Sequence, residues 1–505
     1  MLMSQRAVCL SVGTLLILAA LGCGSGNYTP PLTAIAPTTN PLVAQYSIRH
    51  FHPGLTAWVE FGLDTTYGRQ TSVLTDSAAV PGGQQLNILV AGMLPKKTYH
   101  MRAHADWGTG SWVDQDQTFT TGAIPTSALL PQFATSRPTP TAATPSAGGV
   151  ELLSLVSSLP GYLNAVVTDL QGNVIWYCPG ASTPVKQLLN GHYVLNSGAD
   201  WKEVDLACNT IRDVTTTELD QSLQVAGYSF GPLVAFHHDM LVLPNGHWII
   251  LANVYKEFNN LVGYPGTTNV LGDVLMDIDP NGNVVWAWSA FDHLDVNRHL
   301  QGLPDWTHSN ALVYTDDGNL LLSIRHQSWI IKIDYANGTG AGDIVWKLGD
   351  EGDFTLLGGE TNDWFYAEHY PNVLSTSGSQ STLAIFDNGN LRIDSSGVAC
   401  GSTPSAPACY SRATMFQIDE NTRLATLLWQ YLPGYYSNWG GSIDTLGNGD
   451  VEFNMSNPFN EAASEILEVT HTDSPQIVWQ MTINGVASYR GYRIPSLYPG
   501  VTWQQ

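Results

Sequence analysis

From Val150 to the C-terminus, the chain repeats a short pattern of apolar and polar positions. Each copy has a hairpin of alternating apolar residues around a turn such as Pro-Asn-Gly, Asp-Asp-Gly or Asp-Asn-Gly, then an acidic strand and a closing apolar strand. No long window has the helical period of about 3.6 residues, so the pattern predicts an all-β fold. The closing strands contain tryptophan and read NVIWYCP (Trp176), NVVWAWS (Trp286, Trp288), DIVWKLG (Trp346), TLLWQYL (Trp429) and QIVWQMT (Trp479).

A further copy, KEVDLACNTIRDV, lacks the tryptophan and brings the repeats to six. At ~55 residues per repeat, this spacing suits four-stranded blades and predicts a six-bladed β-propeller over residues 150–505. We expect the tryptophans to dock each blade on the next one. A quinone-type redox cofactor held by them is the alternative.

A different β pattern precedes the repeats. Residues 44–122 contain short alternating strands, among them LTAWVEFGL and TYHMRAHADW, in an order that resembles a fibronectin type III-like β-sandwich. Residues 24–43 are rich in Ser, Thr, Pro and Asn and are predicted to be a tether. Residues 123–149 are rich in Pro, Thr and Ala and are predicted to link the two domains.

The first 23 residues read as an export signal. Arg6 precedes the apolar run Leu15–Leu21, and Ala20-Leu21-Gly22-Cys23 resembles a bacterial lipobox, in which the cysteine is lipidated. Plain signal-peptide cleavage is the alternative. No second apolar run approaches the ~20 residues of a membrane helix. We therefore expect an exported protein, periplasmic or anchored to the outer membrane of a Gram-negative bacterium through lipid on Cys23.

The net charge restricts the partners that the protein could bind, and the cysteine content indicates its redox compartment. With 20 Lys plus Arg against 43 Asp plus Glu, the formal net charge is −23, which argues against a nucleic-acid partner. An even number of cysteines beyond the signal favours disulfides in an exported chain. Cys400 and Cys409 bracket a flexible loop and are the preferred pair, and Cys178 with Cys208 follows by elimination; free buried thiols are the alternative.

Three histidines hold one register against the repeated strands. His237, His308 and His369 each lie four residues before an apolar position of the strand that follows, so equivalent blades would direct all three toward a shared centre. His238 would point elsewhere if the strand alternates regularly, although an irregular start would exchange it with His237. In the second of these segments, Asn310 shares a strand face with His308. Nearby arginines, Arg325 and Arg392, add positive charge.

Such a group of histidines suits either an oxyanion or a metal ion. Three imidazoles form many metal sites. Arginine, however, has no role beside a cation, whereas its paired N–H groups bind tetrahedral oxyanions well. We therefore favour an anion site and expect neither a metal nor another cofactor.

Four stretches together resemble the bacterial aryl-sulfate sulfotransferases. They are HHDMLVLPNGHWIILA, DWTHSNALVYTDDGNLLLSIRHQSWIIKID, the pair EHYPN and IFDNGNLR, and YRGYRIPSLYPG. The resemblance implies nucleotide-sulfate-independent transfer of a sulfuryl group from an aryl sulfate to a phenol, in a ping-pong reaction through sulfohistidine. The nucleophile would be His369, although the family usually has Gln where Glu368 stands. The groups expected to assist it or to bind substrate are His237, His238, His308, Asn310, Arg325, Tyr370 and Arg392.

Two other function classes stay open at the level of sequence. One is a non-catalytic, ligand-binding propeller lipoprotein, and the other is a metal- or quinone-dependent propeller enzyme. The expected partners are a small aryl sulfate donor and a phenol acceptor. A homodimer is left open.

Overall fold

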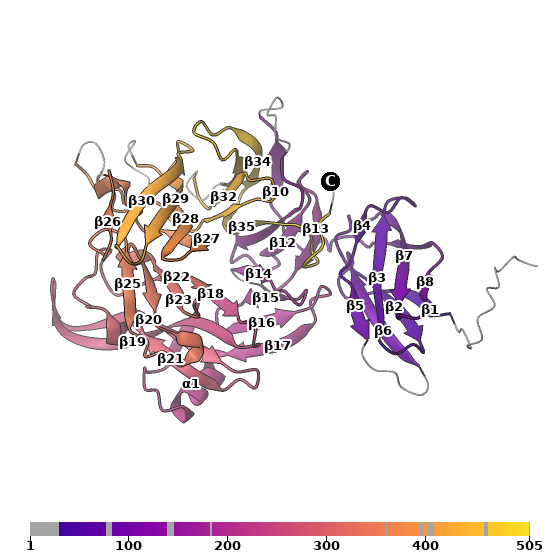
Figure 1. The fold of residues 1–505 in the computed structure, drawn as a ribbon, viewed down its shortest axis with the longest axis horizontal. Helices are drawn as coiled ribbons and strands as arrows, with labels where there is room; N and C mark the ends of the chain where they lie inside the picture. Colours follow the sequence, from indigo (N-terminus) through magenta and orange to yellow (C-terminus); the bar gives the residue numbers. More distant parts are fainter. Residues whose placement is uncertain are drawn as a thin grey trace, which may run out of the picture.

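The computed structural model describes residues 30–76, 83–138, 146–181, 184–359, 361–393, 397–401, 409–458 and 463–503. Within these residues the chain is almost entirely β-structure, arranged as a smaller N-terminal unit beside a larger ring of sheets (Figure 1). The predicted all-β class is confirmed. The predicted signal peptide and the lipidation site at Cys23 lie outside the described residues.

Two sheets form the N-terminal unit. Their inward-facing apolar side chains, such as Tyr46, Val59 and Met101, belong to one buried cluster, as in a β-sandwich. The first sheet contains β1 (Leu32–Pro37), β2 (Ala44–His50) and β6 (Gln84–Val90). The second contains β3 (Leu55–Gly62), β4 (Arg69–Gln70), β5 (Leu74–Asp76), β7 (Thr98–Asp106), β8 (Ser111–Val113) and β9 (Gln117–Thr120).

Both polar segments that the sequence assigned to connections contain strands. Leu32–Pro37 forms β1 and pairs along its length with β2, so this part of the predicted tether belongs to the first sheet. Gln132–Ser136, in the predicted linker, forms β10 and pairs with a strand near the C-terminus. The composition of both segments predicted connections, because Ser, Thr and Pro are frequent in linkers. These residues are also tolerated on edge strands.

Six further sheets follow, each with four or five strands in the described residues. Within each one, consecutive strands are antiparallel neighbours, as the hairpin pattern predicted, except that the short strand Thr355–Leu356 pairs in parallel with Leu424–Tyr431. The first three sheets are β11 (Val150–Val156), β12 (Ala165–Thr168) and β13 (Val174–Cys178) with the C-terminal β35 (Ala487–Ile494); β14 (Val185–Gln187), β15 (Tyr193–Asn196), β16 (Asp200–Val204) and β17 (Thr210–Thr215); and β18 (Leu233–Val242), β19 (Trp248–Leu261), β20 (Tyr264–Ile278) and β21 (Val284–Ser289).

The remaining three sheets carry most of the candidate site. They are β22 (Ser309–Tyr314), β23 (Leu320–Ile324), β24 (Trp329–Ile333) and β25 (Ile344–Leu348); β27 (His369–Ser377), β28 (Gln380–Asp387), β29 (Arg412–Asp419) and β30 (Leu424–Tyr431), with β26 (Thr355–Leu356) beside β30; and β31 (Ser442–Thr445), β32 (Val451–Met455), β33 (Ala463–Val469) and β34 (Ile477–Asn484), with β10 beside β34. The turn predicted at Asp316–Asn319 joins β22 to β23, and Gly318 supplies its positive φ of 79°.

The C-terminal strand joins the last part of the chain to the first sheet. β35 pairs with β11 from Val150 opposite Ile494 to Val156 opposite Ala487. Arg493 on β35 forms ion pairs with Glu151, Glu452 and Glu468, which lie on three different strands. Beyond β35, the Tyr498 hydroxyl donates to the Leu89 carbonyl at 2.8 Å, so the C-terminus also contacts the N-terminal unit (Figure 1).

The repeated tryptophans dock neighbouring sheets, as the sequence predicted. The indole N–H of Trp176 donates to the Leu206 carbonyl at 2.8 Å, and that of Trp288 to the Gly342 carbonyl at 2.9 Å. In each pair the acceptor belongs to the next sheet along the chain. Trp479 closes the ring, because it donates to the Leu170 carbonyl of the first sheet at 3.1 Å.

Helices are few in the described residues, and none of those is long and apolar enough to cross a membrane. They are α1 (Thr216–Val225), α2 (Ala290–His293), and the 3-10 turns η1 (Arg325–Gln327), η2 (Ala336–Gly338) and η3 (Thr361–Asp363). Both predicted disulfides are present, one between Cys178 and Cys208 and the other between Cys400 and Cys409. They fit the predicted exported protein.

Candidate active site

Three strands begin at or near the predicted histidines, and each begins irregularly. β18, β22 and β27 each shift register against the next strand close to the histidine. His238, His308 and Tyr370 have φ angles of 31°, 48° and 50°. Such angles cost non-glycine residues roughly 1–3 kcal/mol each and cluster at functional sites, and bulges redirect side chains. Regular alternation therefore does not decide which side chains meet here.

The three strand starts contact one another directly. The backbone N–H of Leu312 donates to Asp239 Oδ2 at 2.9 Å, and the amide of Asn310 donates to the Glu368 carbonyl at 2.7 Å. β22 is thus bonded to the strand start on either side of it. Arg490 of β35 donates to the Asn310 carbonyl and lies 3.6 Å from Asp239. The C-terminal strand therefore reaches the same place.

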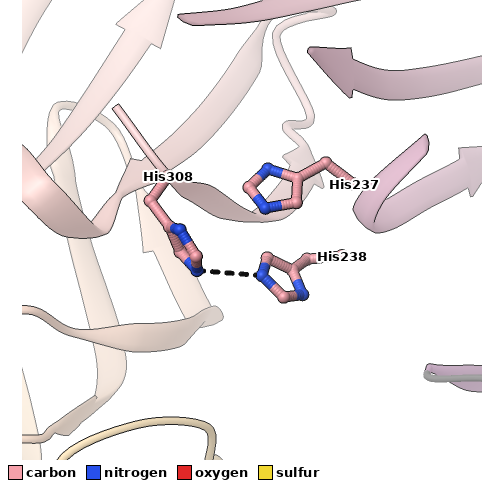
Figure 2. A group of neighbouring side chains, drawn as sticks. All are labelled: His237, His238 and His308. Atoms are coloured by element: carbon pink, nitrogen blue, oxygen red, sulfur yellow. Dashed lines mark hydrogen bonds between the residues drawn. The ribbon is translucent and has the colours of Figure 1, made fainter. Parts of the chain in front are cut away.

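His237, His238 and His308 form one cluster (Figure 2). The Nε2 atoms of His238 and His308 are 3.0 Å apart, and the ring centroids of His237 and His308 are 4.8 Å apart. The sequence left open whether His237 or His238 faces the centre. Both do, because the register shift between Phe236 and Met240 breaks the alternation.

Two aspartates orient this cluster. Nδ1 of His237 is 3.0 Å from Asp273 Oδ1, and Nδ1 of His308 is 2.5 Å from Asp305 Oδ2. Burial alone raises the pKa of Asp273, but the charge of His237 and hydrogen bonds from His237 and Thr307 bring that pKa below its ordinary value. Asp273 is therefore a carboxylate at neutral pH, and it directs the Nε2 atom of His237 away from itself.

His369 is held by a side chain that the sequence did not single out. Its ring is buried, and Nδ1 lies 2.7 Å from Asn388 Oδ1. The Asn388 amide nitrogen donates to the carbonyls of Ser437 at 2.8 Å and Gly440 at 2.9 Å. Because both amide hydrogens are used, the oxygen must face His369 and accept a hydrogen bond from Nδ1.

It follows that Nε2 of His369 carries the lone pair. The backbone N–H of Gly440, 3.2 Å away, is directed at that same atom and agrees with this tautomer. The signal for Asn388 was present in the quoted stretch IFDNGNLR, in which two asparagines follow a strand. Only the fold shows which of them reaches a histidine.

Three of these imidazoles are neutral at neutral pH. Burial lowers the pKa of His238, His308 and His369 well below the usual imidazole value. The next cause is the charge of His237 for the first two and the charge of Arg325 for His369. A proton on His369 would lower the pKa of both His238 and His308, so all four histidines belong to one electrostatic site.

Arg325 is the unmatched charge of the site. Its guanidinium is buried, donates to the Asn438 carbonyl at 3.0 Å and approaches His326 Nε2 at 2.7 Å. Its Nε has no hydrogen-bond partner, and within the described part of the chain no carboxylate forms an ion pair with it. Burial, then the charge of Arg325, lowers the pKa of His326 to about 4, so His326 accepts this bond as a neutral ring.

Tyr489 connects the two halves of the site. Its ring stacks on His238 with centroids 4.9 Å apart and meets His369 edge-on at 5.9 Å. Its hydroxyl is buried and has no hydrogen-bond partner. Burial raises its pKa, so the hydroxyl stays protonated. The stretch YRGYRIPSLYPG contributes to the family resemblance, but the sequence did not single out this tyrosine, because nothing in the pattern distinguishes it from a core aromatic residue.

Two predicted substrate-binding residues have other partners. Arg392 forms an ion pair with Asp387, which Arg412 also contacts through its Nε at 2.7 Å. The Tyr370 ring lies 5.3 Å from the Tyr492 ring and 4.8 Å from the Arg490 guanidinium. Arg392 has no recorded contact with the histidines in the described chain, so its predicted role in binding the anion stays a prediction.

Glu368 turns its carboxyl group away from His369. Its Oε1 accepts a hydrogen bond from the Ser323 hydroxyl at 3.0 Å, and its carbonyl holds Asn310. Burial raises the pKa of Glu368 to about 7. Asn310 likewise turns to Glu368, so it does not point with His308 as strand alternation predicted.

Solved structures offer only distant likeness. A protein of unknown function from Bacteroides caccae is 8% identical, with a TM-score of 0.40, and the match covers 68% of this chain and 98% of that one. A Lactobacillus plantarum protein is 11% identical, with a TM-score of 0.30 and coverages of 77% and 94%. A catalytically inactive virginiamycin B lyase from Staphylococcus aureus, solved with quinupristin, is 10% identical, with a TM-score of 0.27 and coverages of 59% and 93%. Likeness at this level carries no argument about function.

The sequence itself is more informative at the level of the family. No curated protein matches the chain. The family model described as Arylsulfotransferase (ASST), however, matches residues 143–493, which include every histidine of the site and the strands of the ring other than β10 and the last residue of β35. The chain belongs to the arylsulfotransferase family.

Proposed function

We propose that this protein transfers a sulfuryl group from an aryl sulfate to a phenol, through a covalent intermediate on His369. The observation that carries the proposal is a neutral, buried imidazole beside a buried arginine that lacks a carboxylate partner in the described chain. Family membership supports a sulfotransferase. The imidazole supplies the nucleophile, and the arginine supplies a site for the anion.

Arg325 suits a sulfate monoester because its charge is buried and its Nε is unused. The ester bears one negative charge spread over three oxygens, and buried charge-assisted hydrogen bonds are the strong ones. The negative charge of the substrate would thus neutralise the Arg325 guanidinium, which has no carboxylate partner among the described residues. The charge of Arg325 reaches His308 of the histidine cluster, whose rings offer further polar contacts.

In the first half-reaction, Nε2 of His369 attacks the sulfur of the aryl sulfate. An N–S bond forms, the bond from sulfur to the aryl oxygen breaks, and the aryl oxygen leaves with the electron pair as a phenolate. The Gly440 N–H contact, which is long at 3.2 Å, gives way as Nε2 forms this bond. Nδ1 keeps its hydrogen on Asn388, so the sulfated ring is a cation stabilised by that oxygen.

In the second half-reaction, a phenol oxygen attacks the same sulfur and the N–S bond breaks. His369 recovers its lone pair, and the sulfuryl group leaves on the new phenol. The acceptor loses one proton and the first phenolate gains one, so a single group near the sulfur can serve both steps. Our candidates for that group are His308, a member of the histidine cluster whose neutral ring can take the acceptor's proton, and Tyr489, whose ring stacks on His238 and whose hydroxyl is protonated.

The proposal also includes the fold of each domain, the location of the protein and its oligomeric state. We infer that the six sheets are blades of a propeller and that the N-terminal unit is a fibronectin type III-like sandwich. Export, lipidation of Cys23, residence in a Gram-negative periplasm or outer membrane, and a homodimer stay predictions from sequence. Aromatic side chains beside the site, Tyr370 and Tyr489, are candidates to contact the aryl ring.

Replacement of His369 by alanine tests the nucleophile. We expect transfer from 4-nitrophenyl sulfate to added phenol to fall by more than about a thousandfold, since a covalent mechanism has no substitute for its nucleophile. The measurement is release of nitrophenolate together with formation of phenyl sulfate. His192→Ala, which removes a half-exposed histidine paired with Glu203 outside the site, is the matched control and should keep wild-type rates.

Three outcomes contradict this proposal. Full activity in His369→Ala refutes the nucleophile. Nitrophenolate release without phenol, accompanied by free sulfate, indicates a sulfatase. No turnover by the wild-type protein, with tight binding of the ester, favours a binding protein.

Replacement of Asn388 by alanine tests the tautomer. Without the acceptor for Nδ1–H, we expect kcat to fall about 10- to 100-fold while KM for the donor changes little, because one oriented hydrogen bond is worth roughly 1.5–3 kcal/mol. The 15N chemical shifts of His369 should also lose the signature of a pure Nδ1–H tautomer. Asn40→Ala removes another buried asparagine whose amide donates to a carbonyl, that of Tyr177, and should leave kcat unchanged. An equal loss of kcat in both variants would mean that Asn388 acts only through stability.

The depressed histidine pKa values predict how activity and stability respond to pH. A free imidazole titrates near 6.5, but the buried rings titrate well below that value, so kcat/KM should stay flat through pH 6.5 and fall only in more acidic solution. Below about pH 6.5 the unfolded chain binds protons that the folded chain does not, so the free energy of unfolding should decrease as the pH is lowered. Steady-state kinetics and chemical denaturation across pH measure both. An inflection of kcat/KM at 6.5 contradicts the neutral, buried nucleophile.

A further inference from the structure

The histidine cluster has the construction of a transition-metal site. One imidazole nitrogen from each of His237, His238 and His308 lies within 4.8 Å of the other two. The Nε2 atoms of His238 and His308 are 3.0 Å apart, close to the roughly 3.3 Å that separates two nitrogens around a tetrahedral ion with bonds of about 2.0–2.1 Å. The three rings come from two strand starts and face one another (Figure 2).

The surroundings of the rings match what such ions require. Metal-binding histidines usually give their second nitrogen to a carboxylate, which fixes the ring and strengthens the ligand. Here Nδ1 of His237 faces Asp273 at 3.0 Å, and Nδ1 of His308 faces Asp305 at 2.5 Å. Each pair leaves Nε2 as the nitrogen that binds. These two carboxylate–histidine pairs direct the Nε2 atoms of His237 and His308 toward one position, which is the arrangement of a metal site.

Two carboxylates stand directly on the imidazole rings. Asp273 and Asp305 contribute two negative charges there, while Asp239 pairs with both Arg490, at 3.6 Å, and Lys186. With Arg325, which has no carboxylate partner among the described residues, these groups carry no net charge when the imidazoles are neutral, so the two carboxylates bonded to the rings, and not a net negative charge, favour a cation at this point. A second set of ligand atoms, from Asp305, His308 and His326, is less suitable, because Nε2 of His326 already faces the Arg325 guanidinium at 2.7 Å.

We propose that His237, His238 and His308 bind a divalent transition-metal ion such as Zn²⁺, next to the position of the sulfuryl group. Nitrogen ligands of this kind select Zn²⁺ and its neighbours over Mg²⁺ and Ca²⁺, which prefer oxygen. The ion occupies nitrogens that lie beside the reacting sulfur, so metal binding and sulfuryl transfer compete. That consequence, unlike the binding itself, rests on the proposed function.

Binding is measured on the tag-free protein after treatment with a chelator. Co²⁺ is the probe, because its visible absorption reports nitrogen ligands, and equilibrium dialysis counts the ions. We expect one Co²⁺ per chain, displaced by Zn²⁺. His238→Ala and the bulkier His308→Gln should each weaken binding at least about 100-fold, and Asp273→Asn about 10- to 100-fold. His192→Ala, which removes a histidine paired with Glu203 elsewhere, should bind as the wild type does.

Circular dichroism confirms that each variant is folded, and two different ligand variants guard against a single misfolded one. The proposal is wrong if the wild type takes up no Co²⁺, or if both ligand variants bind it as tightly as His192→Ala does. A second experiment measures sulfuryl transfer. Added Zn²⁺ should abolish the transfer, and a chelator should restore it. Unchanged transfer by protein shown to carry Zn²⁺ refutes the competition and leaves the site in place, whereas silent metal-free protein that binds Co²⁺ refutes the proposed function alone.

Discussion

The chemistry proposed for this chain depends on the hydrogen bond between Asn388 and His369. A free imidazole exchanges its hydrogen between two nitrogens and takes up a proton near pH 6.5. Asn388 prevents the exchange, because two carbonyls fix the direction of its amide and leave only its oxygen for Nδ1. Burial prevents the protonation. Together they leave Nε2 as a lone pair of fixed direction, which a nucleophile needs.

Arg325 differs from other buried arginines of the ring of sheets, because each of those arginines pairs with a carboxylate. Arg392 and Arg412 share Asp387, Arg490 lies beside Asp239, and Arg493 contacts three glutamates. A buried charge without a partner is costly, so these pairs are the ordinary solution. Arg325 departs from it in the part of the chain that is described. We interpret the departure as a place kept for an anionic substrate.

The sequence predicted the architecture well because the repeat is carried by local patterns. Turn residues and closing tryptophans mark each repeat in the sequence. In the structure, the tryptophans dock the sheets as expected. Cys400 and Cys409 were paired correctly because a short loop separates them. The errors fell on β1 and β10, where Thr, Ser and Pro resemble a linker although the backbone pairs with a neighbouring strand.

The histidines were found from register alone, but their surroundings were not. Asn388, Asp273 and Tyr489 are between 19 and 251 residues from the histidines that they contact. No pattern in the sequence connects residues so far apart, and irregular strand starts make the direction of each side chain unpredictable. For the same reason the pairing of His238 with His308 could not be foreseen, since it depends on the positive φ angles of both residues.

The covalent intermediate is the central claim, and it can be observed directly. The wild-type protein is mixed with excess 4-nitrophenyl sulfate in the absence of any phenol acceptor, stopped in alkali, and analysed by intact-mass and peptide mass spectrometry. We expect one sulfuryl group per chain, located on His369, absent from His369→Ala and lost when phenol is added. A wild-type protein that turns over the donor and acceptor together but never carries sulfur on His369 would contradict it.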